Sequence, residues 1–140
     1  MMPLLIRGLV VQTNQIMLVD DNQDFLAVSQ EFLEAFEGLR VVGTATSGRE
    51  ALDLLGRISP TLLIVDVSMP EMNGLELTQQ VKRRWPNLPI IVLTLLDTPL
   101  HRQAALQAGA DAFVTKASMD DDLIPAIQGL QAKRGNGNSH

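Results

Sequence analysis

Five short aliphatic runs divide the chain, and each is continuous rather than alternating with polar residues. The runs are Ile16–Val19, Val41–Ala45, Leu62–Val65, Ile90–Leu93 and Ala112–Val114. Strands that are covered on both faces of a parallel sheet have this continuous apolar character, whereas strands with one face in water alternate. The pattern therefore predicts five buried strands of a parallel sheet.

The stretches between these runs have helical spacing, because apolar residues recur three or four positions apart. The four clearest stripes are Phe25, Val28, Phe32 and Phe36; Ala51, Leu54, Leu55 and Ile58; Leu77, Val81 and Trp85; and Leu123, Ile127 and Leu130. Each stripe predicts a helix that covers the sheet with its apolar side.

Residues at the borders of these stretches support the helices. Ser47 and Glu50 have the spacing of a capping box, and Ser118 and Asp121 resemble one. Pro125 falls inside the fifth helix, where it removes a backbone hydrogen bond and predicts a kink. Residues that commonly end or follow helices stand after the first four stretches: Gly38, Pro60, Pro86 and Gly109.

Strand and helix alternate five times, which predicts an α/β fold with a parallel sheet between helices. Right-handed crossovers leave few topologies, and the doubly wound, flavodoxin-like (βα)5 strand order 2-1-3-4-5 is the expected one. We expect one domain over residues 14–132, an N-terminal extension over residues 1–13, and a disordered tail or linker remnant over residues 133–140.

Composition narrows the function classes. A net charge of −5 argues against a nucleic-acid surface, and the absence of cysteine excludes disulfides and thiolate metal sites. No stretch approaches the ~20 apolar residues of a membrane span. The first dozen residues are apolar but interrupted by Arg7 and Gly8, which favours an extension over a signal peptide. We therefore expect a cytoplasmic protein that binds neither nucleic acid nor membranes directly.

Polar residues follow the predicted strands. Asp20 and Asp21 follow the first, Asp66 the third and Lys116 the fifth, and Thr94 ends the fourth. The first and third strands are neighbours, so three carboxylates meet at the switch point of the sheet. Like charges ~4 Å apart repel by about 4 kcal/mol at an effective dielectric near 20, and one lysine does not compensate three carboxylates. The cluster predicts a hard divalent cation, with Mg²⁺ as the first choice, and an aspartate that can attack phosphorus.

The ordered motifs closely resemble the receiver domain of two-component response regulators over residues 14–132. They are the Asp20-Asp21 pair, D-x-x-M-P-x-x-N-G over 66–74, Thr94, AGAD over 108–111 and F-V-T-K over 113–116. In addition, K-A-S over 116–118 is similar to the subgroup that is joined to helix-turn-helix output domains.

The resemblance implies a phosphoryl-accepting site rather than an enzyme acting on other molecules. It implies that Asp66 takes a phosphoryl group from a sensor histidine kinase, a phosphotransfer protein or a small phosphodonor. Asp21, Asp66 and the backbone carbonyl of Ser68 would ligate Mg²⁺, and Asp20 would act through a bound water.

The resemblance also implies a conformational switch. Lys116 pairs with the phosphoryl group, Thr94 hydrogen-bonds it, and Phe113 moves as Thr94 is drawn inward. The fourth helix, fifth strand and fifth helix would then present a changed face to a downstream protein or output domain, with homodimerisation as a further option.

Leu95 departs from the family pattern, and Ser68 and Leu96 stand at two positions where the family varies and the rate of hydrolysis is tuned. Leu95 stands where a small residue is usual, so its bulk is expected to crowd the phosphoryl group. Leu96 offers no acid or amide to orient water, which predicts a long-lived phosphoryl group. The bulk of Leu95 keeps a phosphorylation-independent scaffold, a pseudo-receiver, open as the alternative.

Purely structural roles and two different functions fit these residues less well. Asp20 alone could cap a helix, Asp66 alone could form a turn, and Phe113 could simply belong to the core. A haloacid-dehalogenase-like phosphatase needs a second aspartate where Ser68 stands. A flavin-binding module needs a Ser/Thr/Gly-rich phosphate loop where the acidic D-D-N-Q-D stands. The convergence of three carboxylates and Lys116 favours the receiver.

Overall fold

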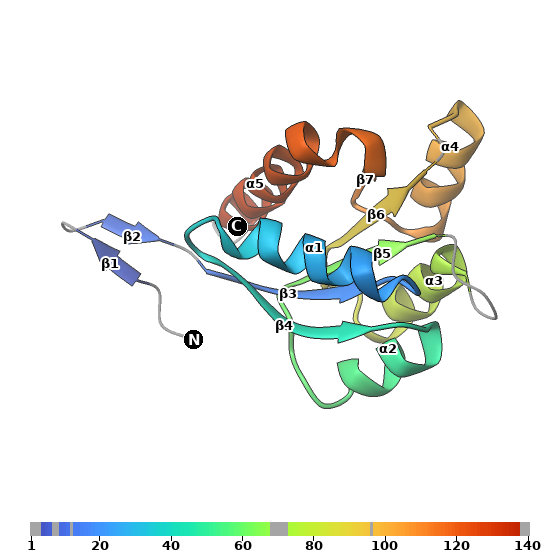
Figure 1. The fold of residues 1–140 in the computed structure, drawn as a ribbon, viewed down its shortest axis with the longest axis horizontal. Coiled ribbons are helices and arrows are strands. Elements are labelled where there is room, and N and C mark those ends of the chain that lie inside the picture. Colours follow the sequence, from blue (N-terminus) through green and yellow to red (C-terminus); the bar gives the residue numbers. More distant parts are fainter. Residues whose placement is uncertain (1–3, 7–8, 12, 68–72, 96, 138–140) are drawn as a thin grey trace.

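A five-stranded parallel sheet forms the centre of the protein, which we describe from a computed structural model (Figure 1). The structure describes residues 4–6, 9–11, 13–67, 73–95 and 97–137. The strand order is β4-β3-β5-β6-β7, which confirms the predicted order 2-1-3-4-5 of the five aliphatic runs. The strands are β3 (Asn14–Val19), β4 (Leu39–Ala45), β5 (Leu62–Asp66), β6 (Ile90–Thr94) and β7 (Ala112–Thr115).

Five α-helices cover the sheet on both faces and create two separate apolar clusters (Figure 1). The first cluster is formed with α2, α3 and α4, and the second with α1 and α5. The helices are α1 (Gln23–Glu34), α2 (Gly48–Leu55), α3 (Gly74–Arg84), α4 (Pro99–Ala108) and α5 (Met119–Gly137).

Neighbouring residues of one strand contribute to opposite clusters. Ile16 and Leu18 of β3 belong to the cluster with α1 and α5, whereas Met17 and Val19 belong to the other. Because side chains alternate across a strand, a strand buried on both faces needs apolar residues at every position. This explains why β3, β5 and β6, which are almost entirely buried, appear in the sequence as continuous runs. The two edge strands, β4 and β7, are only partly buried, so the prediction of five fully buried strands was wrong for them.

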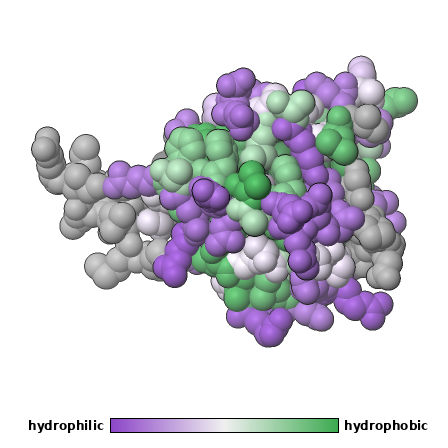
Figure 2. Space-filling view, in the orientation of Figure 1, coloured by the Kyte–Doolittle hydropathy of each residue, from purple (hydrophilic) through white to green (hydrophobic). Residues whose placement is uncertain are grey.

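The buried side of α1 differs from the predicted stripe. Leu26, Ser29 and Leu33 are its buried residues, while Val28 is 60% exposed and Phe36, beyond the end of the helix, 40% exposed. The first helix carries apolar residues around much of its circumference, so spacing alone did not fix which side faces the sheet. Figure 2 accordingly shows hydrophobic surface, broken by hydrophilic side chains, on the face where α1 lies in front of the sheet.

Two helix borders, at Ser47 and Gly109, lie where the sequence predicted them, and the one predicted at Gly38 does not. Ser47 caps α2 by accepting a hydrogen bond from the Glu50 N–H at 3.1 Å, and Gly109 ends α4 with a φ of +105°. Gly38 does not cap α1, because that helix ends at Glu34 and Gly38 forms the left-handed turn into β4 with a φ of +85°. Pro125 lies within α5, and its kink stays a prediction.

The fifth helix begins differently from the expected capping box. Ser118 belongs to a short 3-10 helix, η1 (Lys116–Ser118), and its hydroxyl contacts that of Thr115. The Thr115 side chain, rather than that of Ser118, caps this turn. Because Ser118 is part of this 3-10 turn, it cannot form the expected capping box with Asp121 at the start of α5.

Two short strands precede the domain. β1 (Leu4–Ile6) and β2 (Leu9–Val11) pair antiparallel, lie to one side of the five-stranded sheet (Figure 1), and were not predicted. At the other terminus, α5 continues to Gly137, so the tail boundary expected at residue 133 falls inside a helix. Within the described ranges, no helix is both long and apolar enough to cross a membrane.

Candidate functional site

Three aspartates converge at the carboxyl ends of two adjacent strands. Asp20 follows β3 directly and Asp66 is the last residue of β5, while β3 and β5 pair in parallel with Val19 opposite Val65. Carboxylate oxygens of Asp20, Asp21 and Asp66 all lie within 4.8 Å of one another. Asp20 and Asp66 are only 2% and 3% exposed. The sheet thus places these groups together as the sequence predicted.

Lys116 supplies the positive charge that faces this cluster. It opens η1 directly after β7, and its Nζ lies 2.8 Å from Asp20 Oδ2 and 3.5 Å from Asp66 Oδ1. The Lys116 side chain is itself only 14% exposed, so the pairing occurs at low effective dielectric. One ammonium between two buried carboxylates, with Asp21 beside them, leaves the cluster with excess negative charge.

The chain after β3 holds Asp20 in place. Its Oδ1 accepts a hydrogen bond from the Asn22 N–H at 2.9 Å, while its Oδ2 faces Lys116. Asn22, not Asp20, caps α1, since its Oδ1 accepts from the Phe25 N–H at 3.0 Å. The alternative in which Asp20 serves only as a helix cap is therefore wrong.

The start of α3 lies directly against the strand that carries Asp66. The Asn73 side chain caps this helix, and the Gly74 N–H donates to the Val67 carbonyl at 3.2 Å. A Cβ added to Gly74 would come within 2.2 Å of the Asp66 carbonyl oxygen and 2.6 Å of the Val67 Cα. Only glycine allows the backbone of α3 to approach Asp66 this closely.

Thr94 and Phe113 occupy neighbouring strands. Thr94 ends β6 as a buried residue, and Phe113 in β7 is half-buried against the cluster with α2, α3 and α4. The Arg102 guanidinium of α4 lies 4.8 Å from the centroid of the Phe113 ring. Arg102 also hydrogen-bonds Asp97 at 2.7 Å, which holds the pKa of that carboxyl below its usual value. The switch roles of Thr94 and Phe113 stay predictions.

Phe25 is a site residue that the sequence did not reveal. Lys116 Nζ lies 4.2 Å from the centroid of its ring, so the aromatic face contacts the ammonium that pairs with Asp20 and Asp66. The sequence placed Phe25 only in the apolar stripe of α1. Its position in the first turn after the acidic pair was the available signal.

Some predicted features lie outside the described residues, namely the Ser68 carbonyl and the Leu96 side chain. Leu95 is described and is 69% exposed. Most of its side chain therefore faces solvent rather than packing among the buried acidic groups. This exposure weighs against the expected crowding.

The donor set fits Mg²⁺. Asp20, Asp21 and Asp66 offer oxygen ligands, which hard divalent cations prefer, and the three are close enough to share one ion. The three carboxylates also carry more negative charge than the single Lys116 ammonium balances, which favours binding of a divalent cation. Asp21 and Asp66, assisted by Asp20, are the residues that could hold the ion.

Comparison with known proteins agrees with this geometry. The family model for the response regulator receiver domain matches residues 16–128. Response regulator GacA of Pseudomonas aeruginosa is 31% identical over 114 residues, covering 81% of this chain and 53% of its own length. Response regulator MprA of Mycolicibacterium vanbaalenii is 36% identical over 116 residues, covering 83% of this chain and 49% of its own length.

Solved structures are similar over nearly the whole chain. A LuxR-family two-component response regulator from Aurantimonas sp. SI85-9A1 superposes with a TM-score of 0.83 at 29% identity, covering 87% of each chain. The isolated REC domain of RcsB from Salmonella enterica serovar Typhimurium gives a TM-score of 0.80 at 30% identity, covering 86% of this chain and 90% of that one. The chain therefore belongs to the response regulator receiver domain family. It spans about half the length of GacA and MprA.

Proposed function

We propose that this chain is a phosphorylation switch in which Asp66 accepts a phosphoryl group from a sensor histidine kinase or phosphotransfer protein, with Mg²⁺ as cofactor. The observation that carries the proposal is the acidic cluster, in which the buried Asp66 carboxylate lies within 4.8 Å of those of two other aspartates and 3.5 Å from Lys116 Nζ. A structural salt bridge needs one carboxylate, whereas this site buries two, Asp20 and Asp66, beside the exposed Asp21, which has a large electrostatic cost. A site that binds a cation and a phosphoryl group explains that cost.

The chemistry follows from the placement of these groups. An Asp66 carboxylate oxygen attacks phosphorus, the P–N bond of the donor phosphohistidine breaks, and its electron pair stays on the imidazole, which takes up a proton. Lys116, already facing Asp66, pairs with the phosphoryl oxygens, and the Thr94 hydroxyl donates a hydrogen bond to them. When bound, Mg²⁺ neutralises phosphoryl charge. The chain then catalyses only its own phosphorylation and dephosphorylation.

The readout face of the switch comprises α4, β7 and α5. Phe113 of β7 contacts Arg102 of α4, so movement of its ring would change the position of that helix. Leu100 and Leu106 of α4 are exposed, which supplies apolar surface for a partner protein, an output domain or a second copy of the chain. We assign DNA contact to a partner or output domain rather than to this chain, whose net charge is −5.

Intact-protein mass spectrometry tests the proposal. Incubation with acetyl phosphate and Mg²⁺ should add one phosphoryl group, a gain of about 80 Da. The Asp66→Asn variant and a sample with EDTA should show no gain. If the wild type gains no mass and Leu95→Ala restores the gain, the bulk of Leu95 blocks the site. If neither gains mass, the chain is a pseudo-receiver and the proposal is wrong.

The phosphoryl group should be long-lived once attached. Leu96 provides no side chain that orients or activates water for attack on phosphorus. After removal of excess acetyl phosphate, the decay of the phosphorylated mass should take many minutes or longer. The Leu96→Glu variant, which adds a possible water-orienting group, should decay faster. A wild-type half-life of seconds would contradict this expectation.

Phe25→Leu should slow phosphorylation by acetyl phosphate at least roughly two- to fivefold, because the contact of an aromatic face with an ammonium contributes about 0.5–1 kcal/mol at the low end of its range. Leucine keeps an apolar side chain but removes the ring that lies 4.2 Å from Lys116 Nζ. The initial rate of mass gain measures the effect. Phe25→Tyr, which retains a ring, should stay near the wild-type rate.

Phe32→Leu provides the matched control for that change. Phe32 lies in the same helix and packs edge-on against Phe36, with ring centroids 5.4 Å apart. Its loss should lower stability without changing the initial rate of phosphorylation. Equal rates for Phe25→Leu and the wild type would show that the ring does not position Lys116.

A further inference from the structure

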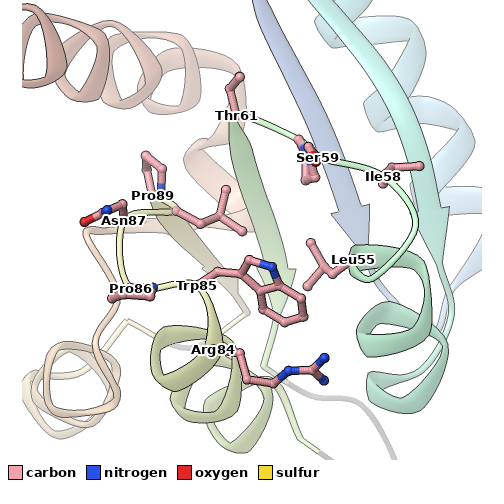
Figure 3. Close-up of a pocket in the computed structure, with 11 residues that line it drawn as sticks. Leu55, Ile58, Ser59, Thr61, Arg84, Trp85, Pro86, Asn87 and Pro89 are labelled. Carbon is pink, nitrogen blue, oxygen red and sulfur yellow. The ribbon is translucent and has the colours of Figure 1, made fainter.

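A pocket of about 430 Å³ lies at the end of the sheet opposite Asp66 (Figure 3). Thr61 and Pro89 line it, and they directly precede β5 and β6, whose other ends carry Asp66 and Thr94. The walls come from the end of α2, the end of α3 and the loops that follow them. Its volume falls in the range of roughly 300–1,000 Å³ that is typical of small-molecule sites.

The lining combines apolar surface with a single charge. Trp85 projects from the end of α3 toward Leu55 of α2, and Ile58 lies on the loop that follows α2 (Figure 3). Leu88 completes the apolar wall. Among the described residues that line the pocket, Arg84 alone is charged. A ligand of matching chemistry has an apolar body and one negative charge.

Arg84 is positioned as a receptor for an anion. Its Cζ lies 4.4 Å from the centroid of the Trp85 ring, which holds the guanidinium at the pocket. Lys82, in the same turn of α3, is already paired with Asp111 at 2.8 Å. Within the described ranges, the ion pairs formed by acidic side chains involve Lys82, Arg102 and Lys116, and not Arg84.

We propose that this pocket binds a small amphipathic carboxylate, such as an aromatic or branched-chain acid. The apolar body packs between Trp85, Leu55 and Ile58, and the carboxylate pairs with the Arg84 guanidinium, whose planar donors match its two oxygens. The pocket is a second binding site, separate from the acidic cluster at the other end of the sheet. It does not depend on the proposed phosphorylation of Asp66.

Intrinsic tryptophan fluorescence can measure ligand binding at this pocket. Trp85 is the single tryptophan in a chain without tyrosine, so tryptophan emission reports on the pocket alone. Titration with 3-phenylpropionate should change the emission saturably, with a Kd of about 0.1–1 mM for a ligand of this size. The neutral 3-phenylpropanamide, which has the same shape, should bind at least about tenfold more weakly.

Two arginine variants distinguish specific binding of the acid at Arg84 from nonspecific attraction to the basic end of α3. Arg84→Gln should weaken binding of the acid at least about tenfold, and Arg83→Gln, its neighbour outside the lining, should stay within about twofold of the wild type. Since Arg84→Gln also alters the surroundings of Trp85, its affinity is read from the amide NMR shifts of Thr61 and Leu88. Asp66→Asn should bind the acid as the wild type does.

Three outcomes would overturn the proposal. One is the absence of any saturable change up to about 20 mM acid, well above the expected Kd. Another is equal affinity for the acid and the amide, which would show that Arg84 does not pair with the carboxylate. The third is an equal loss in Arg83→Gln and Arg84→Gln, which would show general attraction to the basic end of α3.

Discussion

Gly74→Ala should lower the free energy of unfolding by about 3 kcal/mol or more, at the upper end of the cost of overpacking. The new Cβ would lie 2.2 Å from the Asp66 carbonyl oxygen and 2.6 Å from the Val67 Cα. Both neighbours are backbone atoms, so no side-chain rotation can relieve the contact. The start of α3 must move away from β5, and the strand end that carries Asp66 moves with it.

Thermal unfolding measures this effect, with an expected fall in Tm of roughly 10 °C or more. Gly129→Ala is the matched control, because a Cβ there meets nothing within 4 Å and the residue lies inside α5. It should stabilise the protein by about 0.5–1 kcal/mol through helix propensity. The yield of phosphorylated protein should also fall in Gly74→Ala. A Tm that matches the wild type would show that α3 can shift without cost.

Lys116→Met should destabilise the protein by about 3–5 kcal/mol when no divalent cation is present, because it removes the partner of buried carboxylates. Asp20 and Asp66 would remain near one another, almost fully buried, without the ammonium that lies 2.8 and 3.5 Å from them. Methionine preserves most of the side-chain length, so the loss reports on charge rather than on volume. Phosphorylation by acetyl phosphate should slow by at least about 100-fold through loss of a charge at the phosphoryl group.

Urea unfolding with and without Mg²⁺ measures this prediction. A cation that binds only the folded cluster adds stability, so Mg²⁺ should recover part of the loss in Lys116→Met. Lys82→Met is the control, since Lys82 pairs with the more exposed Asp111 away from the cluster. That variant should lose about 1 kcal/mol or less, with no response to Mg²⁺ and a normal phosphorylation rate. Equal losses in the two variants would contradict the central role of Lys116.

These two positions illustrate how the site depends on groups that do not react. Gly74 sets the distance between a helix and the strand end that carries Asp66. Lys116 offsets part of the repulsion that arises when the buried Asp20 and Asp66 carboxylates are brought together at the ends of β3 and β5. The excess negative charge that remains favours a bound cation, which is the basis of the proposed Mg²⁺ site.

The sequence alone determined the sheet and the location of the acidic cluster. Strands buried on both faces need apolar residues at each position, so β3, β5 and β6 were visible as continuous runs. Parallel strands end at the same edge, so Asp20 and Asp66 had to meet once β3 and β5 were neighbours. Local rules also sufficed for the Ser47 cap, because such bonds join residues three positions apart.

Only the tertiary structure decided the contacts between segments far apart in the chain. Asp20 and Lys116 are 96 residues apart in the chain but hydrogen-bond at 2.8 Å, and the ring of Phe25 in α1 contacts the same Lys116 ammonium. The buried side of α1, the approach of Gly74 to Asp66 and the pairing of β1 with β2 were likewise absent from local patterns. The physical reason is that periodicity fixes which residues share a side of an element, whereas packing against other elements fixes where that side points.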